Sequence, residues 1–421
     1  MSRGELTEFQ TEALKRSVAQ AAKSPYYSAK FKEIGLDPGD IKAANDITKL
    51  PFTTKNDLRL SYPTGMLTVE PELVLRMHTS SGTTGKPTAI FHTREDVDCW
   101  AELMARCLHM GGARPHDVFQ NMSGYGLFTG GLGLHYGAER IGMWCIPAGA
   151  GNTARQITLI RDFHVTVIHA TPSYAMHIAE RMVQEGGDPK SLGIKIAALG
   201  AEPYTEELRL KLQDLYGFKA FNSYGLSEMN GPGVAFECEC QDGMHVWEDA
   251  YLVEIINPQT LESAKEGEVG ELVMTSLRRT AMPIIRYRTR DLTRILPGGC
   301  SCGREHKRLA RMTGRSDDML IIRGVNVFPS QIEEVLMRHK WLGGNYVIHL
   351  TTKESLDQMT VKVEIAKDAF DGSVETLRSR RGELQKQLKE QIGFTANVEV
   401  VEPGSLPVSE GKAKRVVDER L

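Results

Sequence analysis

Strand-like and helix-like spacings of apolar residues alternate along the middle of the chain. Residues 165–168 and 194–199 form β-rich apolar runs, whereas apolar residues between 174 and 183 recur at helical spacing. After Thr205 a second helical pattern stops at Gly217, a residue type favoured just beyond a helix end. Strands separated by helices predict βαβ units and a mainly parallel sheet over residues 74 to about 225.

The flanking regions have different patterns. Residues 1 to about 70 predict a helical, proline-broken lead-in, and the β-rich region from about 246 to 300 contains predicted strands at 251–256 and 270–274. Further strands and helices are predicted, in the order βαββαβ, at 320–322, 330–338, 346–350, 360–365, 374–392 and 397–401. We therefore expect an α/β fold with a large N-terminal domain over 1–316 and a small α+β domain over 317–421.

A hydroxyl-rich and glycine-rich loop occupies 79–87, with the sequence Thr-Ser-Ser-Gly-Thr-Thr-Gly-Lys-Pro. It lies between a predicted strand at 73–77 and a helix that begins with a capping-box pattern at 93–96. Glycines let backbone N–H groups approach a phosphate, and hydroxyls and a lysine add donors and charge. Two residues rather than four separate the glycines, so this is not a Walker loop. The candidate phosphate ligands are Ser80, Ser81, Gly82, Thr83, Thr84, Gly85 and Lys86; the alternative is a surface turn.

Other candidate residues follow predicted strands. The run Gly200, Ala201, Glu202 and Pro203 stands where parallel sheets bind ligands, although an ordinary turn is the alternative. Glu228 follows Asn222, Ser223, Tyr224 and Gly225, and a single carboxylate suits Mg²⁺, which keeps phosphate and water oxygens. A solvated glutamate is the alternative there. An ionised Asp291 only accepts hydrogen bonds, which suits a diol, or it forms a structural ion pair with a neighbouring arginine.

Composition limits the class of protein. A chain of 421 residues with a formal net charge of −3 is long enough for two or three domains and gives no sign of a nucleic-acid partner. Its apolar runs are shorter than the ~18–20 residues of a transmembrane helix, and its polar N-terminus does not resemble a signal peptide. We therefore expect a cytoplasmic protein without a membrane partner, in which the seven cysteines are reduced or metal-bound.

Two closely spaced cysteine pairs and a histidine form a candidate Zn²⁺ site. Thiolate and imidazole ligands in a tetrahedral arrangement suit this metal, but the C-x-C spacing is shorter than the usual C-x2-C. Five residues compete for four ligand positions: Cys238, Cys240, His245, Cys300 and Cys302. Ordinary reduced cysteines and a redox role are the alternatives.

Five motifs in order resemble the adenylate-forming superfamily, which includes acyl-CoA synthetases. These motifs are 79–87, 224–228, 287–291, 314–318 and Gly411-Lys412. Four further segments have sequences similar to those of the phenylacetate-CoA ligase family, and this likeness covers nearly the whole chain. They are 24–27, 50–55, 285–292 and 319–329. The resemblance implies a large N-terminal domain with a small antiparallel β subdomain, a mobile C-terminal domain, and a homodimer.

The resemblance also implies roles for residues in ATP chemistry. The loop at 80–86 would hold the β- and γ-phosphates, Tyr224 would pack on adenine beside 200–203, and Asp291 would bind the ribose hydroxyls. Glu228 would bind Mg²⁺. Arg315 would take part in catalysis and also bind ATP. Lys412 would bridge the carboxylate and the α-phosphate. Lys414 is the alternative for that lysine.

The remaining expectations are an acid pocket, which the residues themselves indicate, and coenzyme A binding with domain rotation, which the resemblance implies. The aromatic, glycine-rich run at 123–137 predicts an acid pocket, and the expected contacts are Tyr125, Phe128, Tyr136 and Ala148. Glycine-assisted helix packing is the alternative for this run. Domain rotation about Asp317 would present the coenzyme A-binding residues Arg323, Gly324, Val325 and Asn326. The expected reaction forms an acyl-adenylate and then a thioester; another aryl acid, another acceptor or a nucleotide-binding regulator are the alternatives.

Overall fold

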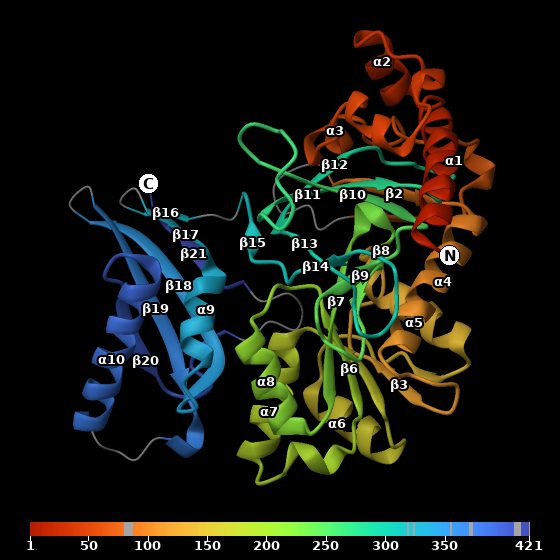
Figure 1. Cartoon of the computed structure of the whole chain (residues 1–421). Coiled ribbons are helices and arrows are strands. Elements are labelled where there is room, and N and C mark those ends of the chain that lie inside the picture. The colour runs from red at the N-terminus through yellow and green to blue at the C-terminus, as the bar shows by residue number, and fades with distance from the viewer. Residues whose placement is uncertain are drawn as a thin grey trace. The chain divides into compact units, whose positions relative to one another are not determined.

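The computed structural model of the protein describes residues 1–79, 87–317, 320–322, 325–353, 356–369, 374–407 and 414–420. The chain divides into two compact units, one made of 1–149 with 221–312 and the other of 150–220 with 313–421. Figure 1 shows the elements of both units. The boundary predicted at 316/317 on sequence grounds stays a prediction. No helix in the described ranges is long and apolar enough to cross a membrane.

The N-terminal part of the first unit is helical. Its elements are α1 (Arg3–Ala21), α2 (Pro25–Glu33), α3 (Lys55–Leu60) and the 3₁₀ helices Pro38–Asp40, Ala44–Lys49 and Pro71–Leu73. A capping box between Ser2 and Glu5 starts α1. Leu14 and Val18 of α1 are fully buried in one cluster with Tyr27 and Ile285, so one face of this helix packs into the core.

Two sheets of the first unit carry most of the candidate residues. The antiparallel sheet has the order β10 (Tyr251–Ile256), β11 (Gly270–Ser276) and β12 (Tyr287–Thr293). The other sheet includes β13 (Ile295–Leu296), β14 (Arg308–Leu309), β9 (Met244–Val246), β8 (Gly231–Glu237) and β7 (Lys219–Leu226), which are joined antiparallel, and the parallel pair β3 (Val118–Asn121) and β4 (Trp144–Ile146). The α/β class is confirmed, and the sheet that contains β3 and β4 is mixed, with both parallel and antiparallel pairs.

A hairpin and two packed helices complete this unit. The hairpin is β1 (Arg76–Thr79) and β2 (Ala89–His92), followed by α4 (Arg94–Met110), α5 (Thr129–Ile141) and the 3₁₀ turn Ser227–Met229. The predicted capping box at Thr93 is confirmed, since its side chain accepts from the N–H of Asp96. The prediction of a strand at 73–77 was wrong in its first half. Residues 71–73 form a 3₁₀ helix begun by a proline, which leaves the strand to start at 76.

The second unit contains the middle helices and the C-terminal region. Its middle part has α6 (Thr153–Asp162), β5 (Val167–Ala170), α7 (Pro172–Gln184), the 3₁₀ helix Pro189–Leu192, β6 (Ile196–Gly200) and α8 (Glu206–Tyr216). Strands β5 and β6 are parallel, as predicted. Gly217 ends α8 with a left-handed φ of 75°, which confirms the predicted stop.

The C-terminal region forms the predicted α+β arrangement. Its elements are β15 (Gly314–Arg315), β16 (Leu320–Ile322), β17 (Val325–Val327), α9 (Pro329–Met337), β18 (Leu342–Lys353), β19 (Leu356–Ile365), the 3₁₀ helix Lys367–Ala369, α10 (Val374–Ile392), β20 (Asn397–Val401) and β21 (Val416–Asp418). The sheet order is β20-β19-β18-β21, and α9 and α10 pack together over it (Figure 1). Strands β17 and β21 were not predicted from the sequence.

Candidate functional site

The hairpin β1–β2 flanks the predicted phosphate loop, whose residues 80–86 lie outside the described residues. The N–H of Thr79 donates to the carbonyl of Leu127 at 3.0 Å. Nδ1 of His78 hydrogen-bonds with the same carbonyl at 3.1 Å. The loop therefore begins from paired strands that are tied to the predicted acid-binding segment.

Glu228 is a buried carboxylate with a defined orientation. The hydroxyl of Tyr287 donates to its Oε1 at 3.1 Å, and Nη1 of Arg279 donates to its backbone carbonyl at 2.8 Å. Only 6% of Glu228 is exposed. A carboxylate fixed in this way can hold a cation while β12 supplies the supporting hydroxyl. Tyr287 lies in the motif at 287–291, 59 residues from Glu228, so this contact could not be predicted from sequence spacing.

Tyr224 and Asp291 also lie together, as the nucleotide prediction requires. The hydroxyl of Tyr224 donates to Oδ2 of Asp291 at 2.6 Å. Arg288 and Arg290, the neighbours considered as structural partners of Asp291, both pair with Glu271, at 2.8 and 3.4 Å. The hydroxyl of Tyr224 on β7 and the carboxylate of Asp291 on β12 thus form one polar contact within the first unit.

The strand that carries Tyr224 packs closely on its neighbour. A Cβ on Gly225 would lie 2.1 Å from the carbonyl oxygen of Gly231, so only glycine fits there. Asn222 and Ser223 are buried, and the N–H of Asn222 donates to Glu237 at 2.7 Å. These contacts explain why small and polar residues precede Tyr224 and Glu228.

The other predicted nucleotide residues belong to the second unit. Ala201 follows β6 with a left-handed φ of 69°, and Glu202 accepts a hydrogen bond from the N–H of Ser173 at 2.6 Å. The turn at 200–203 therefore directs its carboxylate to the start of α7. Arg315 pairs with Asp317, the predicted hinge residue, at 2.8 Å.

The predicted acid-binding residues have mixed surroundings. Tyr125 hydrogen-bonds with Asn121 and His135 at 3.0 and 3.2 Å, and burial raises the pKa of its hydroxyl to about 12. Tyr136 accepts a hydrogen bond from Arg76 at 3.1 Å. Phe128, at the N-terminus of α5, is 47% exposed. Ala148 lies just after β4 and is partly buried.

Glycines of the same run serve helix packing as well. A Cβ on Gly133 would lie 2.3 Å from the ring of Trp100, and one on Gly137 would lie 2.5 Å from Cβ of Met104. These two glycines of α5 therefore allow its close contact with α4. The packing alternative accounts for them, while the acid-binding prediction concerns the aromatic residues around them.

Several predicted residues cannot be placed. Arg323, Gly324 and Lys412 lie outside the described residues, as does the loop from Ser80 to Lys86. Val325 and the backbone of Asn326 form β17. The roles assigned to these residues stay predictions.

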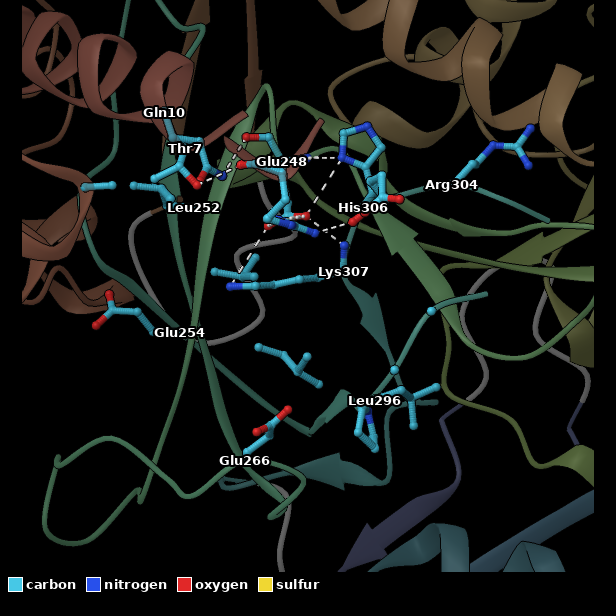
Figure 2. Close-up of a pocket in the computed structure, with 18 of the residues that line it drawn as sticks. Thr7, Gln10, Glu248, Leu252, Glu254, Glu266, Leu296, Arg304, His306 and Lys307 are labelled. Atoms are coloured by element: carbon cyan, nitrogen blue, oxygen red, sulfur yellow. Dashed lines mark hydrogen bonds and ion pairs between the residues drawn. The ribbon is translucent and has the colours of Figure 1, made fainter. Parts of the chain in front are cut away.

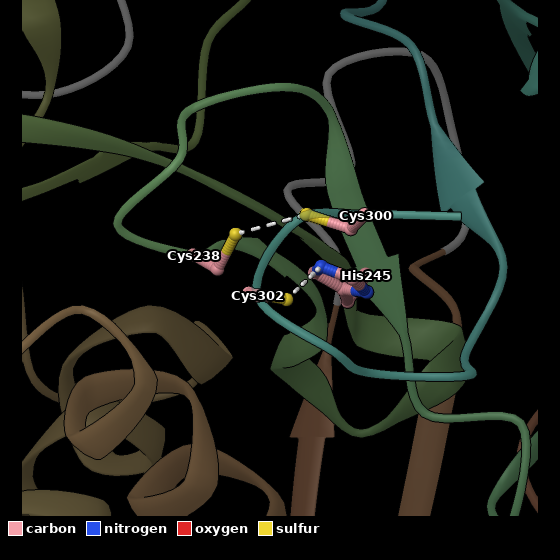
Figure 3. Close-up of side chains that lie close together, drawn as sticks. All are labelled: Cys238, His245, Cys300 and Cys302. Atoms are coloured by element: carbon pink, nitrogen blue, oxygen red, sulfur yellow. Dashed lines mark hydrogen bonds between the residues drawn. The ribbon is translucent and has the colours of Figure 1, made fainter. Parts of the chain in front are cut away.

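Four of the five candidate zinc ligands converge (Figure 3). Sγ of Cys238 lies 3.6 Å from Sγ of Cys300, and Sγ of Cys302 lies 3.3 Å from Nε2 of His245. All four ligand atoms are within 4.8 Å of one another. Cys240 is not in this group; it is exposed, and its sulfur accepts from the hydroxyl of Ser301. The cluster joins the end of β8, strand β9 and the loop before β14.

A cavity of about 750 Å³ lies elsewhere, between α1, β10 and residues 295–307 (Figure 2). Of the predicted site residues that the structure describes, Cys300 alone lines this cavity. Its buried carboxylate, Glu248, accepts hydrogen bonds from Arg3 at 2.8 Å and from the N–H of Lys307 at 2.7 Å. These bonds fasten α1 to the segment before β14, so the charge within the cavity has a structural role.

Comparisons with known proteins give the chain's relatives. The sequence profile of the AMP-binding enzyme family matches residues 19–278, and that of the AMP-binding enzyme C-terminal domain matches residues 324–420. The chain is 47% identical to the phenylacetate-coenzyme A ligase of Pseudomonas putida, over 99% of this chain and 94% of that protein. It is also 47% identical to the phenylacetate-coenzyme A ligase of Aromatoleum evansii, over 100% of this chain and 96% of that protein.

A solved 2-hydroxyisobutyryl-CoA ligase provides the structural comparison. Its postadenylation state, in complex with R3-HIB-AMP, matches with a TM-score of 0.94 at 29% identity, covering 100% of this chain and 90% of that one. Its thioesterification state, with 2-HIB-AMP and CoA, matches with a TM-score of 0.74 at 30% identity, covering 100% and 91%. That ligase therefore has different arrangements in the two states.

Proposed function

The chain belongs to the AMP-binding enzyme family, among the phenylacetate-coenzyme A ligases, and on this premise we propose that it joins phenylacetate to coenzyme A. In the first step the carboxylate attacks the α-phosphate of ATP and displaces pyrophosphate. In the second step the thiol of coenzyme A attacks the acyl-adenylate, which releases AMP and leaves a thioester. The identity of 47% over nearly the full length of both relatives carries this proposal.

The residues would act by positioning and by electrostatic stabilisation, because negative charge grows on the phosphoryl oxygens during the first step. The loop from Ser80 to Lys86 would hold the β- and γ-phosphates. Tyr224 would pack its ring against adenine, and Asp291 would accept hydrogen bonds from the ribose hydroxyls. The contact between these two residues supports both roles. Lys412 would approach the attacking carboxylate, with Lys414 as the alternative.

Glu228 is the proposed Mg²⁺ ligand. Its burial and its hydrogen bond from Tyr287 hold one carboxylate in place, and Mg²⁺ bound with ATP needs few protein oxygens. When bound, the ion would neutralise phosphate charge. The carboxylate would orient that complex, and Tyr287 would fix the carboxylate.

The first experiment measures acid-dependent pyrophosphate release with ATP and Mg²⁺. Phenylacetate is expected to give the fastest release among phenylacetate, benzoate, a hydroxyphenylacetate, indole-acetate and short aliphatic acids, and coenzyme A should carry the product to a thioester. Faster release with another acid replaces the substrate. Release that coenzyme A neither speeds nor consumes indicates another acceptor. Stabilisation by ATP without release for any acid would favour a nucleotide-binding regulator.

We also propose that Zn²⁺ binds Cys238, His245, Cys300 and Cys302. Tetrahedral ligands at the usual Zn–S and Zn–N distances are separated by about 3.8 Å for two sulfurs and about 3.5 Å for sulfur and nitrogen. The distances of 3.6 and 3.3 Å are close to these values. Nδ1 of His245 hydrogen-bonds with the carbonyl of His306 at 3.3 Å, which leaves Nε2 for the metal.

This ion would have a structural role. It would join the loop after β8 to the loop before β14, and strands β9 and β14 already pair at His245 and Arg308. Protein purified without chelator should contain one zinc per chain by elemental analysis. Cys302→Ser should lose the zinc and lower the melting temperature, whereas Cys240→Ser, the matched control, should keep both. Wild-type protein without zinc, or zinc loss in the control, would contradict this ligand set.

Compartment and assembly complete the proposal. The described structure contains seven free cysteines, which suits the reducing cytoplasm. A homodimer is expected from the family resemblance. Light scattering of the purified chain would measure its mass in solution and decide between monomer and dimer.

A further inference from the structure

Strand β18 is irregular where it meets α7. Its pairing with β19 shifts register between Leu342 and Tyr346. Gly343, Gly344 and Asn345 occupy the shift, and such a bulge bends a strand and redirects its backbone. Strand β18 packs against α7 within the second unit.

Polar contacts fasten the irregular strand to α7 and α8. The N–H of Gly344 donates to Oε1 of Glu180 on α7 at 2.7 Å. Nζ of Lys211 on α8 donates to the carbonyl of Leu342 at 2.7 Å. Burial raises the pKa of Glu180, whereas the N–H of Gly344 and the charge of Lys211 lower it. The carboxylate of Glu180 is therefore shielded from water, and its hydrogen bond from Gly344 compensates for the lost hydration.

The fit at Gly344 leaves no room for a side chain. A Cβ at this position would lie 2.1 Å from Cγ of Met176 and 3.2 Å from its Cβ and Sδ. Met176 is 2% exposed, so its side chain has little space to move away. An alanine at 344 is consequently incompatible with the contact between β18 and α7.

The same strand segment holds the chain that follows the predicted catalytic lysine. Arg415 donates to Oδ1 of Asn345 at 3.0 Å and to the carbonyl of Gly344 at 3.4 Å. Its guanidinium also lies 4.4 Å from the ring centroid of Tyr346. Lys412 is three residues earlier in the sequence. Arg415 therefore ties β18 to a segment close in sequence to the predicted catalytic lysine.

We propose that Gly344 and Glu180 form a docking contact that holds the C-terminal region in place for adenylation and is released for thioester formation. Gly344 is in this sense a positioning residue. The inference rests on the proposed function. The solved 2-hydroxyisobutyryl-CoA ligase matches with a TM-score of 0.94 in its postadenylation state and 0.74 in its thioesterification state, which supports a contact that is released before thioester formation.

The test separates the two half-reactions of Gly344→Ala in the full chain. Phenylacetate-dependent pyrophosphate exchange should fall at least tenfold, while thioester formation from supplied phenylacetyl-adenylate and coenzyme A should stay within about threefold of wild type. Retention of the second half-reaction shows that the variant is folded. Gly382→Ala on α10 is the matched control, because a Cβ there meets nothing within 4 Å, and both rates should be unchanged.

A second variant tests the contact itself. Met176→Ala in the Gly344→Ala background removes the Cγ and Sδ that the new Cβ would meet, and it should restore pyrophosphate exchange. Normal exchange in Gly344→Ala, equal loss of both half-reactions, or absence of rescue by Met176→Ala would each overturn the inference. Wild-type protein that adenylates no phenylacetate would instead contradict the proposed function.

Discussion

At the residue scale, the charge of Glu228 can be tested apart from its hydrogen bond. Glu228→Gln keeps the size of the side chain and an oxygen that accepts from Tyr287, but it removes the negative charge. If this carboxylate binds Mg²⁺, pyrophosphate release should fall by roughly a hundredfold. Initial rates over a range of Mg²⁺ concentrations measure the effect, and the magnesium requirement should rise.

The matched variant is Tyr287→Phe, which removes the hydroxyl and keeps the carboxylate. Loss of such a supporting group should lower activity by roughly tenfold. A larger loss in Tyr287→Phe than in Glu228→Gln would show that the metal-binding role of Glu228 is wrong.

The sequence identified Glu228 through its motif, but its bond with Tyr287 joins residues 59 apart. Local pattern carries no information on such a contact.

At the scale of elements, the glycines of α5 allow helix packing to be tested independently of ligand binding. Gly133→Ala would push a Cβ to 2.3 Å from the ring of Trp100, so overpacking between α4 and α5 should lower the free energy of unfolding by about 1–3 kcal/mol. Chemical denaturation measures this change. Gly124→Ala is the control from the same run, because a Cβ there meets nothing within 4 Å and stability should be unchanged. A fully stable Gly133→Ala would contradict the packing role.

Elements with strong periodicity were predictable, and those set by distant partners were not. The strand predicted at 251–256 is β10, and the helix predicted at 374–392 is α10. By contrast, β21 has only three residues and exists because it pairs with β18, about seventy residues earlier. The zinc cluster shows the same limit: spacing gave five candidates, and only the fold separated Cys240 from the four that converge.

At the scale of the whole molecule, the family resemblance supplied the expected rotation about Asp317, and the structure shows what this residue contacts. Its carboxylate accepts from Nε and Nη2 of Arg315, at 2.8 and 3.0 Å, in an exposed pair. A hinge is defined by a change in φ and ψ between two states, so the predicted rotation is tested by comparing the two half-reactions.

Asp317→Pro should slow the second half-reaction and spare the first. Proline fixes φ and restricts the preceding residue, so the rotation that brings coenzyme A to the adenylate should be impeded. Thioester formation should fall roughly tenfold or more in single-turnover measurements, with pyrophosphate exchange near wild type. Asp317→Ala removes the ion pair with Arg315 but keeps backbone freedom, so both half-reactions should persist. If Asp317→Ala is as slow as Asp317→Pro, the ion pair rather than rotation at 317 limits thioester formation.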